Sequence, residues 1–258
     1  MTTSAPPTRG EPAGTPKDEH EATAARPSPE SREEWARFLS GLVHELKTPL
    51  ASLGMITQLL GQDGERRLDE GAARYVRNLG ELSREIQTLV NDTGVLARLW
   101  SGKKPVRRQP VSLSELLTRA EDAARGRGWE RGVSLVTLLG PDLPNEIRTD
   151  PVLLEDSLGG LLETAIVLAR ENVSLRVSVA GSEIAFAVAS DGGCGPGEDA
   201  AALFDPFQGA TAHRIHRRGG RSLAPLLARE LARALGGDVS LVSGSERTHC
   251  VLRLPLDG

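Results

Sequence analysis

The sequence has few of the residues that stabilise small secreted proteins or anchor a chain in a membrane. Only two of its 258 residues are cysteines, which excludes a disulfide framework and a cysteine-rich zinc site. It has no uncharged apolar run of about 18 residues and no basic-then-apolar N-terminus, so we expect neither a membrane span nor a secretory signal. The net charge of −4 argues against bulk attraction to nucleic acid. These absences favour a reduced, cytoplasmic protein.

The first part of the chain lacks the residues that form a core. Residues 2–30 contain no aliphatic residue larger than alanine, no aromatic residue and no cysteine, and they are rich in proline. Such a segment cannot bury enough apolar surface to offset its chain entropy. We therefore expect residues 1–30 to be a disordered tail and the front of the chain to have no sensory domain.

Two long runs of apolar residues with a period of 3.5 follow, which is typical of helices that pack in bundles. The first run is Trp35, Leu39, Leu42, Leu46, Pro49, Leu53, Ile56 and Leu60, and the second is Leu68, Ala72, Tyr75, Leu79, Leu82, Ile86, Leu89, Thr93, Leu96 and Trp100. Gly61, Asp63 and Gly64 provide a turn between them. We expect residues 31–100 to form an antiparallel helical hairpin, and two hairpins to pair as a four-helix bundle in a homodimer.

The remainder of the chain has a mixed pattern. Residues 101–110 are polar and basic with two prolines, which predicts a linker in which Arg107 and Arg108 need no special role. Residues 111–258 alternate helical and strand-like segments: we expect helices at 113–124, 151–170 and 223–235, and strands at 133–139, 173–179, 184–189, 239–242 and 250–254. This order predicts a two-layer α/β sandwich with a mainly antiparallel sheet, and an α+β fold overall.

The clearest chemical motif is His-Glu-Leu-Lys-Thr-Pro-Leu at residues 44–50. If Leu42 and Leu46 point inward, His44 faces solvent, and Thr48 lies one turn later on the same face. An exposed imidazole can act as a nucleophile, and a neighbouring carboxylate can orient it and take its proton. A lone histidine on a bundle is more often an ordinary surface residue, so the interpretation depends on the whole motif.

Proline in this motif has a predicted structural effect. Pro49 has no N–H, and its ring clashes with the carbonyl of Glu45, so the helix should bend beside His44.

This motif resembles the phosphoacceptor box of two-component sensor histidine kinases, and the hairpin resembles their dimerisation and phosphotransfer domain. The resemblance extends over about residues 31–256. It implies that His44 is the phosphoacceptor and Glu45 the base that activates it. It also implies that Thr48 positions water when such a protein dephosphorylates a partner response regulator.

The second half resembles the ATP-binding domain of the same family. Ser190 to Gly195 fits its D-x-G-x-G box, in which Asp191 would bind the adenine amine while Gly193 and Gly195 admit the nucleotide. The other matching segments are Phe204 to Phe207, Gly220, Gly236 to Val239, and Thr248 to Pro255. Gly220 lies in the segment that resembles the family's lid, the loop beside the nucleotide phosphates, and Phe204 to Phe207 precede it. Taken alone, residues 191–197 could equally be a glycine-rich turn between strands.

Several positions depart from the family pattern. The family motif N-L-L-x-N-A is replaced by a segment with Gly160 and Thr164 in place of the two asparagines, the second of which holds magnesium. In the lid, Ser222 and Ala224 replace glycines, and Pro225 removes an amide donor near the first helical turn. These changes predict that ATP and Mg²⁺ are bound weakly, if at all.

The lid also contains a basic stretch at residues 213–218. It could be a replacement phosphate clamp built from arginines, or a solvated loop. His213 and His216 have no cysteine or carboxylate partners at ligand spacing, so we expect no metal site there.

Three functions stay open from the sequence. The first is a relay of phosphoryl groups through His44 to or from a response regulator aspartate, with ATP-dependent autophosphorylation weakened or lost. The second is an active cytoplasmic ATP-dependent histidine kinase. The third is a non-enzymatic module that binds a response regulator receiver domain.

Overall fold

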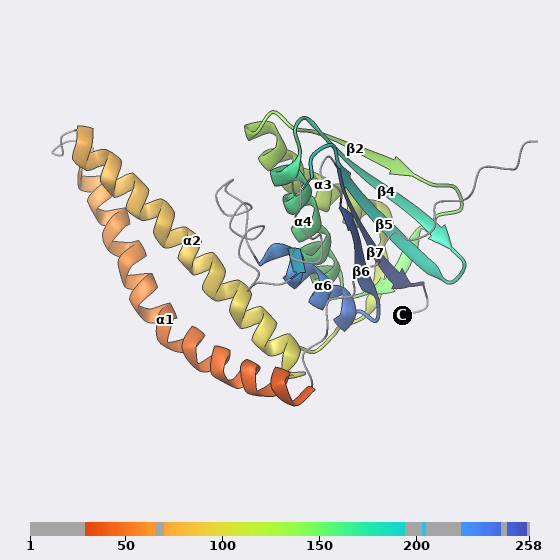
Figure 1. The fold of residues 1–258 in the computed structure, drawn as a ribbon, viewed down its shortest axis with the longest axis horizontal. Helices are drawn as coiled ribbons and strands as arrows, with labels where there is room; N and C mark the ends of the chain where they lie inside the picture. Colours follow the sequence, from red (N-terminus) through yellow and green to blue (C-terminus); the bar gives the residue numbers. More distant parts are fainter. Residues whose placement is uncertain (1–28, 65–69, 194–202, 205–222, 244–246, 257–258) are drawn as a thin grey trace, which may run out of the picture.

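The computed structural model describes residues 29–64, 70–193, 203–204, 223–243 and 247–256 (Figure 1). A helical hairpin is followed by an α/β sandwich, which confirms the predicted fold class. The predicted tail at residues 1–30 lies outside the described residues, except that Pro29 and Glu30 already belong to the first helix.

The hairpin consists of α1 (Pro29–Gly64) and α2 (Glu70–Trp100), which lie side by side. Figure 1 shows α1 as a continuous, curved helix beside the straighter α2. Gly61, Asp63 and Gly64 are helical, so their prediction as a turn is wrong. A single glycine costs a helix only about 1 kcal/mol, and an established helix adds residues cooperatively, so these glycines do not stop it.

The sandwich is built on a five-stranded sheet with the order β2-β4-β5-β7-β6. Its strands are β2 (Ser134–Leu139), β4 (Asn172–Ala180), β5 (Glu183–Ser190), β7 (Thr248–Pro255) and β6 (Asp238–Ser243). Only β2 pairs in parallel, with β4, so the sheet is mainly antiparallel as predicted.

A second, two-stranded sheet was not predicted. It pairs β1 (Gln109–Ser112) with β3 (Glu146–Thr149), and β1 begins inside the predicted linker. Each strand has only four residues, which is too short for an alternating pattern to stand out in the sequence.

Three helices cover one face of the five-stranded sheet: α3 (Leu113–Glu130), α4 (Pro151–Leu168) and α6 (Ala224–Ala234) (Figure 1). Alternate residues of β5, namely Ile184, Phe186 and Val188, are buried in the core beneath them. Among the described residues no helix covers the opposite face, and the edge strand β2 exposes Val136, Leu138 and Leu139.

The middle helix, α4, lies between α3 and α6 and is buried along most of its length. It begins at Asp150, whose carboxylate accepts hydrogen bonds from the N–H groups of Val152 and Leu153, and Pro151 occupies the first turn. None of the helices in the described residues combines the length and apolarity needed to cross a membrane.

Candidate functional site

His44 lies on α1 and is exposed to solvent, as the motif predicts. The residue before it, Val43, is buried against α2, and one residue along a helix turns the side chain by about a quarter of a circle. Thr48, one turn later, is also exposed, and its backbone carbonyl accepts a hydrogen bond from Ser52 Oγ at 3.1 Å. The side chain of Glu45 lies outside the described part of the structure. The hairpin therefore presents an accessible imidazole and a hydroxyl on one face.

The two helices of the hairpin do not meet along the predicted apolar stripe. Leu42 and Leu46 are 40% and 37% exposed, so the expectation that they point inward is wrong for the single chain. Most of the buried residues belong to a neighbouring heptad register, namely Ala36, Val43, Leu50 and Thr57 on α1, and Ser83, Val90 and Ala97 on α2; Asp92 and Leu96 of α2 are buried as well. Small side chains at these positions let the helices approach closely, which leaves the larger leucines outside.

Thr164 lies on the buried side of α4. It is 1% exposed, and its hydroxyl donates a 2.7 Å hydrogen bond to the carbonyl oxygen of Gly160, one turn earlier. A Cβ atom on Gly160 would lie 3.0 Å from the carbonyl oxygen of Ala224, so α6 packs directly against this turn of α4. Ser157 Oγ also donates to the carbonyl oxygen of Ala228 on α6, at 2.8 Å. The segment that differs from the family motif is thus a close contact between two helices.

Asp191 follows β5 and binds the turn between α4 and β4. Its Oδ1 accepts hydrogen bonds from the backbone N–H groups of Arg170 and Glu171. Its Oδ2 accepts from the backbone N–H groups of Glu171 and Asn172 and from the side-chain amide Nδ2 of Asn172, and all these bonds are 2.9–3.2 Å long. Burial raises the pKa of Asp191, but the hydrogen bonds from Asn172, Arg170 and Glu171 outweigh it and hold this pKa below its ordinary value. A carboxylate has about four lone-pair sites, and these donors occupy them.

Two other predicted residues lie near Asp191. Thr248 is buried at the start of β7 and pairs in register with Ser190 of β5, the residue before Asp191. Gly193 is half-buried after Gly192, where a Cβ would collide with the carbonyl oxygen of Leu168. The structure therefore gathers these positions where β5 ends beside the end of α4.

The other residues predicted to form the ATP-binding site fall largely outside the described residues. These are Gly195, Gly220, Ser222, residues 205–207 and the basic stretch 213–218. Phe204 is described: it is buried, and the guanidinium of Arg229 lies 4.4 Å from its ring centre.

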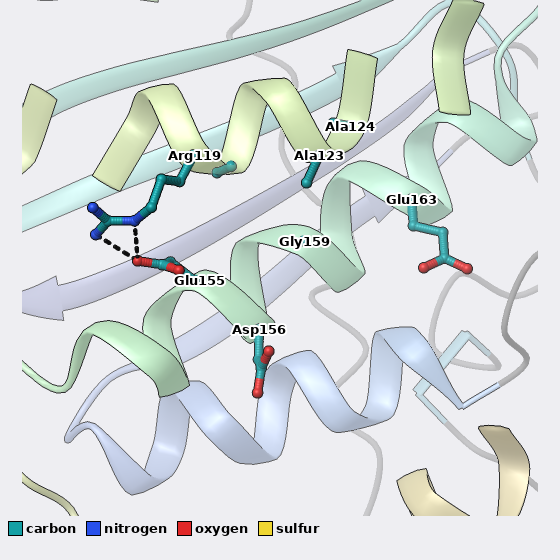
Figure 2. A pocket seen from close by; sticks show the side chains of 8 residues that line it. Arg119, Ala123, Ala124, Glu155, Asp156, Gly159 and Glu163 are labelled. Carbon is teal, nitrogen blue, oxygen red and sulfur yellow. Dashed lines mark hydrogen bonds and ion pairs between the residues drawn. The ribbon is translucent and has the colours of Figure 1, made fainter. Parts of the chain in front are cut away.

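A cavity of about 320 Å³ lies between α3 and α4 (Figure 2). Its lining consists of Arg119, Ala120, Ala123, Ala124, Glu155, Asp156, Gly159 and Glu163. Figure 2 shows Arg119 reaching across to Glu155, with the closest atoms 2.6 Å apart, and Glu163 at the opposite end. Of the predicted nucleotide-binding residues that the structure describes, none lines this cavity.

Comparison with known proteins identifies the hairpin. Residues 34–102 match the His Kinase A (phospho-acceptor) domain. Sensor protein TorS of Escherichia coli strain K12 is 29% identical over 224 residues, which cover 85% of this chain and 24% of TorS. The hairpin belongs to the His Kinase A (phospho-acceptor) domain family, and the chain as a whole is similar to two-component sensor histidine kinases.

Other histidine kinases extend the similarity over both parts of the chain. The probable sensor histidine kinase TcrY of Mycobacterium tuberculosis is 29% identical over 227 residues, covering 86% of this chain and 46% of TcrY. The structure of full-length ShkA in complex with AMPPNP has a TM-score of 0.70 and 25% identity, covering 86% of this chain and 46% of ShkA. The histidine kinase AdeS of Acinetobacter baumannii shares the fold, with a TM-score of 0.59 and 17% identity. The match covers 83% of this chain and 98% of the AdeS chain. The chain spans about a quarter to a half of the length of TorS and TcrY.

The described residues of this histidine kinase homologue do not provide the magnesium site that the resemblance implies. Thr164 is buried, and its hydroxyl donates a hydrogen bond within its own helix; the neighbouring Glu163 is also buried. Within the described ranges, no three residues of the types His, Cys, Asp and Glu are grouped to hold a metal ion. Magnesium at a nucleotide site takes one or two protein oxygens besides phosphates and waters, and the hydroxyl of Thr164 is already bonded to Gly160. An adenine amine would also have to displace one of the donors on Asp191.

The kinase homologue's linker has a role that the sequence did not reveal. The guanidinium of Arg108 donates to the carbonyl oxygen of Leu235 at the end of α6, and the N–H of Arg107 donates to Asp150 Oδ2. The prediction that these arginines need no special role is therefore wrong for Arg108, whereas the contact of Arg107 uses only its backbone. The pair Asp150-Pro151 is a recognisable helix start, but nothing in the sequence indicated that Asp150 also binds the linker.

Proposed function

We propose that this chain relays phosphoryl groups through His44, to or from the aspartate of a response regulator, and that its ATP-dependent autophosphorylation is weakened or lost. The observation that best supports this relay is that His44 is exposed while its neighbour Val43 is buried between the two helices. The imidazole can be reached by a partner protein without any rearrangement of the hairpin.

The transfer is a simple displacement in chemical terms. A neutral ring nitrogen of His44 attacks the phosphorus of an aspartyl phosphate, an N–P bond forms, and the P–O bond to the aspartate breaks to release its carboxylate. Glu45 takes or returns the imidazole proton, and Thr48 positions water when the phosphoryl group is removed from the partner. The reverse sequence phosphorylates the receiver.

Weak ATP use is supported by the α4 turn and by Asp191. The hydroxyl of Thr164 is committed to Gly160, and the oxygens of Asp191 are committed to residues 170–172. Phosphoryl transfer from ATP depends on positioning and charge stabilisation, and loss of one such stabilising group costs about 10²–10³ in rate. An active kinase is the second candidate, because the similar ShkA was solved with AMPPNP.

We also propose that two hairpins pair as a homodimer. The predicted apolar stripe is exposed on the single chain: Trp35, Leu42, Leu46, Leu53, Ile56, Leu60, Tyr75, Leu79, Leu82 and Ile86 are 37–64% exposed. Contiguous apolar surface of this kind marks an interface. A second hairpin would cover it and complete a four-helix bundle.

The experiment that tests the relay uses a phosphorylated receiver domain as donor. We expect labelled phosphate to move to the intact protein and not to a His44→Ala variant, whose stability should stay within about 0.5 kcal/mol because the side chain is exposed. Label entering that variant would show that another residue is the acceptor. Incubation with labelled ATP and magnesium, with nucleotide binding measured in parallel, separates the relay from the kinase. Rapid labelling of His44 by ATP would favour the kinase.

A further inference from the structure

The outer edge of β2 is a row of backbone groups with which no described strand pairs. β2 stands at one end of the sheet, beside β4 (Figure 1). The N–H groups of Ser134 and Gly140 donate to carbonyl oxygens just before and within β4, at 2.7 and 2.8 Å. Because backbone groups alternate sides along a strand, those of Leu135, Thr137 and Leu139 point away from β4. These three residues are the ones that a further strand would bind.

The side chains of β2 are apolar on both faces of the sheet. Leu135 packs against the core beneath the helices, and Thr137 and Leu139 share its face because side chains alternate along a strand. Val136 and Leu138 lie on the opposite, open face, where they are 50% and 42% exposed. Leu139 is 64% exposed although it lies on the helix-covered face. A strand added at this edge would therefore cover apolar side chains on both faces.

Thr137, in the middle of β2, has a polar atom without a partner. Its Oγ1 is buried and makes no hydrogen bond within the part of the chain that the structure describes. A buried hydroxyl that makes no hydrogen bond destabilises the chain that contains it. Rotation about χ1 can turn this hydroxyl toward the edge, where a neighbouring strand would supply a partner.

We propose that β2 pairs, in antiparallel orientation, with β2 of a second copy of this chain. A two-fold axis perpendicular to the sheet keeps the helices of both copies on the same face. The outward backbone groups are all used in one register, in which Thr137 lies opposite Thr137 of the second copy and Leu135 lies opposite Leu139. Each of these pairs exchanges two N–H···O=C bonds, which gives about six in all. A shift of two residues in either direction leaves one outward residue unpaired in each copy.

The same register makes the side chains self-complementary, which is why a second copy is the occupant. On the open face Val136 lies opposite Leu138 of the second copy, and on the other face Leu135 meets the exposed Leu139. The two Thr137 hydroxyls lie across from each other, so each gains the hydrogen-bond partner that it lacks in the single chain. No charged residue is brought opposite another, because the strand contains none.

This pairing would be a second interface beside the proposed hairpin dimer. A dimer formed through the hairpins carries two β2 edges, so edge pairing joins one dimer to another. The strand has only six residues, so pairing matters most where the protein is already concentrated. The inference concerns assembly and does not depend on phosphotransfer through His44.

The register is tested by disulfide crosslinking of the full chain, after Cys194→Ser and Cys250→Ala remove the native thiols. Thr137→Cys, Val136→Cys and Leu138→Cys are oxidised under mild conditions at high protein concentration, each alone and the last two as a mixture. One variant of the mixture carries a size tag, so that a non-reducing gel separates the mixed product from the others. Paired Cα atoms in an antiparallel sheet are about 4.5–5.5 Å apart, which is within the range of a disulfide.

We expect Thr137→Cys to crosslink with itself, and Val136→Cys to crosslink with Leu138→Cys at least about tenfold more than either does with itself, because identical residues are then only diagonal neighbours. Ala180→Cys, which is exposed at the end of β4, is the matched control and should crosslink only through random collision. Circular dichroism confirms that each variant is folded.

Sedimentation provides a second measurement that needs no cysteine. The double variant Val136→Lys, Leu138→Lys places like charges opposite each other, so it should abolish any growth beyond the hairpin dimer as concentration rises. Ala180→Lys should leave that growth unchanged.

Three results would overturn the proposal: Thr137→Cys crosslinking no more than Ala180→Cys, a mixed product no more abundant than the self-crosslinked ones, or growth that persists in the double lysine variant. Failure of His44 to accept phosphate, with the expected crosslinks intact, would count against the proposed function alone.

Discussion

Two adjacent glycines of α4 provide a direct test of how closely α6 packs on this helix. Gly159 and Gly160 both lie inside α4, but their surroundings differ. A Cβ atom on Gly159 would have no heavy atom within 4 Å beyond its own chain neighbours and helix backbone, whereas one on Gly160 would lie 3.0 Å from Ala224 O and 3.4 Å from Ala228 Cβ. Alanine at either position gains the same helix propensity, so the pair isolates the effect of packing.

The expected magnitudes follow from these distances. Gly159→Ala should stabilise the protein by about 1 kcal/mol, which is the difference in helix propensity between glycine and alanine. Gly160→Ala gains the same amount but must push α6 away by a few tenths of an ångström, and such overpacking costs about 1–3 kcal/mol. The difference between the two variants should therefore be about 1–3 kcal/mol, with Gly160→Ala the less stable.

Urea unfolding followed by circular dichroism measures this difference directly. Equal stability of the two variants within about 0.5 kcal/mol would refute the close contact between α4 and α6. Gly160 stands where the family motif has an asparagine, whose side chain is larger than that of alanine. The same contact with α6 therefore leaves no room for the family residue at this position.

Two further perturbations test the hairpin and the Asp191 turn. Leu82→Glu should dissociate the proposed dimer, as measured by sedimentation, and should leave the stability of the monomer nearly unchanged because Leu82 is 52% exposed in the single chain. Arg77→Glu, which lies off the apolar stripe, is the control. A Leu82→Glu variant that remains a dimer would place the interface elsewhere. Asp191→Asn should lower the free energy of unfolding at neutral pH by about 1 kcal/mol. The folded-state pKa of Asp191 is lowered, so its stabilisation is present above the unfolded pKa and is lost as the pH falls through the folded value. The difference between parent and Asp191→Asn should therefore shrink in acid, and a difference that grows on acidification would contradict this account.

The sequence predicts the order of elements well because each has a strong local pattern. The alternation in β5 and the apolar length of α4 are examples, and their predicted bounds differ from the observed ones by one or two residues. The sequence also located the apolar stripe of the hairpin, but it did not show which helix or chain packs against that stripe. Leucines at a period of 3.5 identify an interface without saying whether the partner is the other helix or a second chain, and here the small residues around Val43 and Val90 make the contact within the chain.

Candidate site residues were harder to interpret where tertiary contacts decide their role. The D-x-G-x-G pattern located Asp191 at the end of β5, but its hydrogen bonds to residues 170–172 depend on how α4 and β4 are joined. The hydrogen bond from Trp100 to Glu230 has no local signal at all, because this contact exists only after α2 and α6 are brought together. A local sequence pattern shows which face of a helix or strand is apolar, but it does not show which polar residues distant in the sequence will form hydrogen bonds.

The free edge of the sheet has a practical consequence for the isolated protein. β2 presents one unpaired row of backbone N–H and C=O groups, and its exposed side chains include Val136, Leu138 and Leu139. The strand Ser134–Leu139 contains no proline and no charged residue of the kind that blocks edge-to-edge pairing. At high concentration such an edge can recruit the same strand of another molecule and start aggregation that is unrelated to the hairpin interface. A strand of six residues offers few hydrogen bonds to a second molecule, so this association should be weak. We therefore expect aggregation through β2 only at high protein concentration.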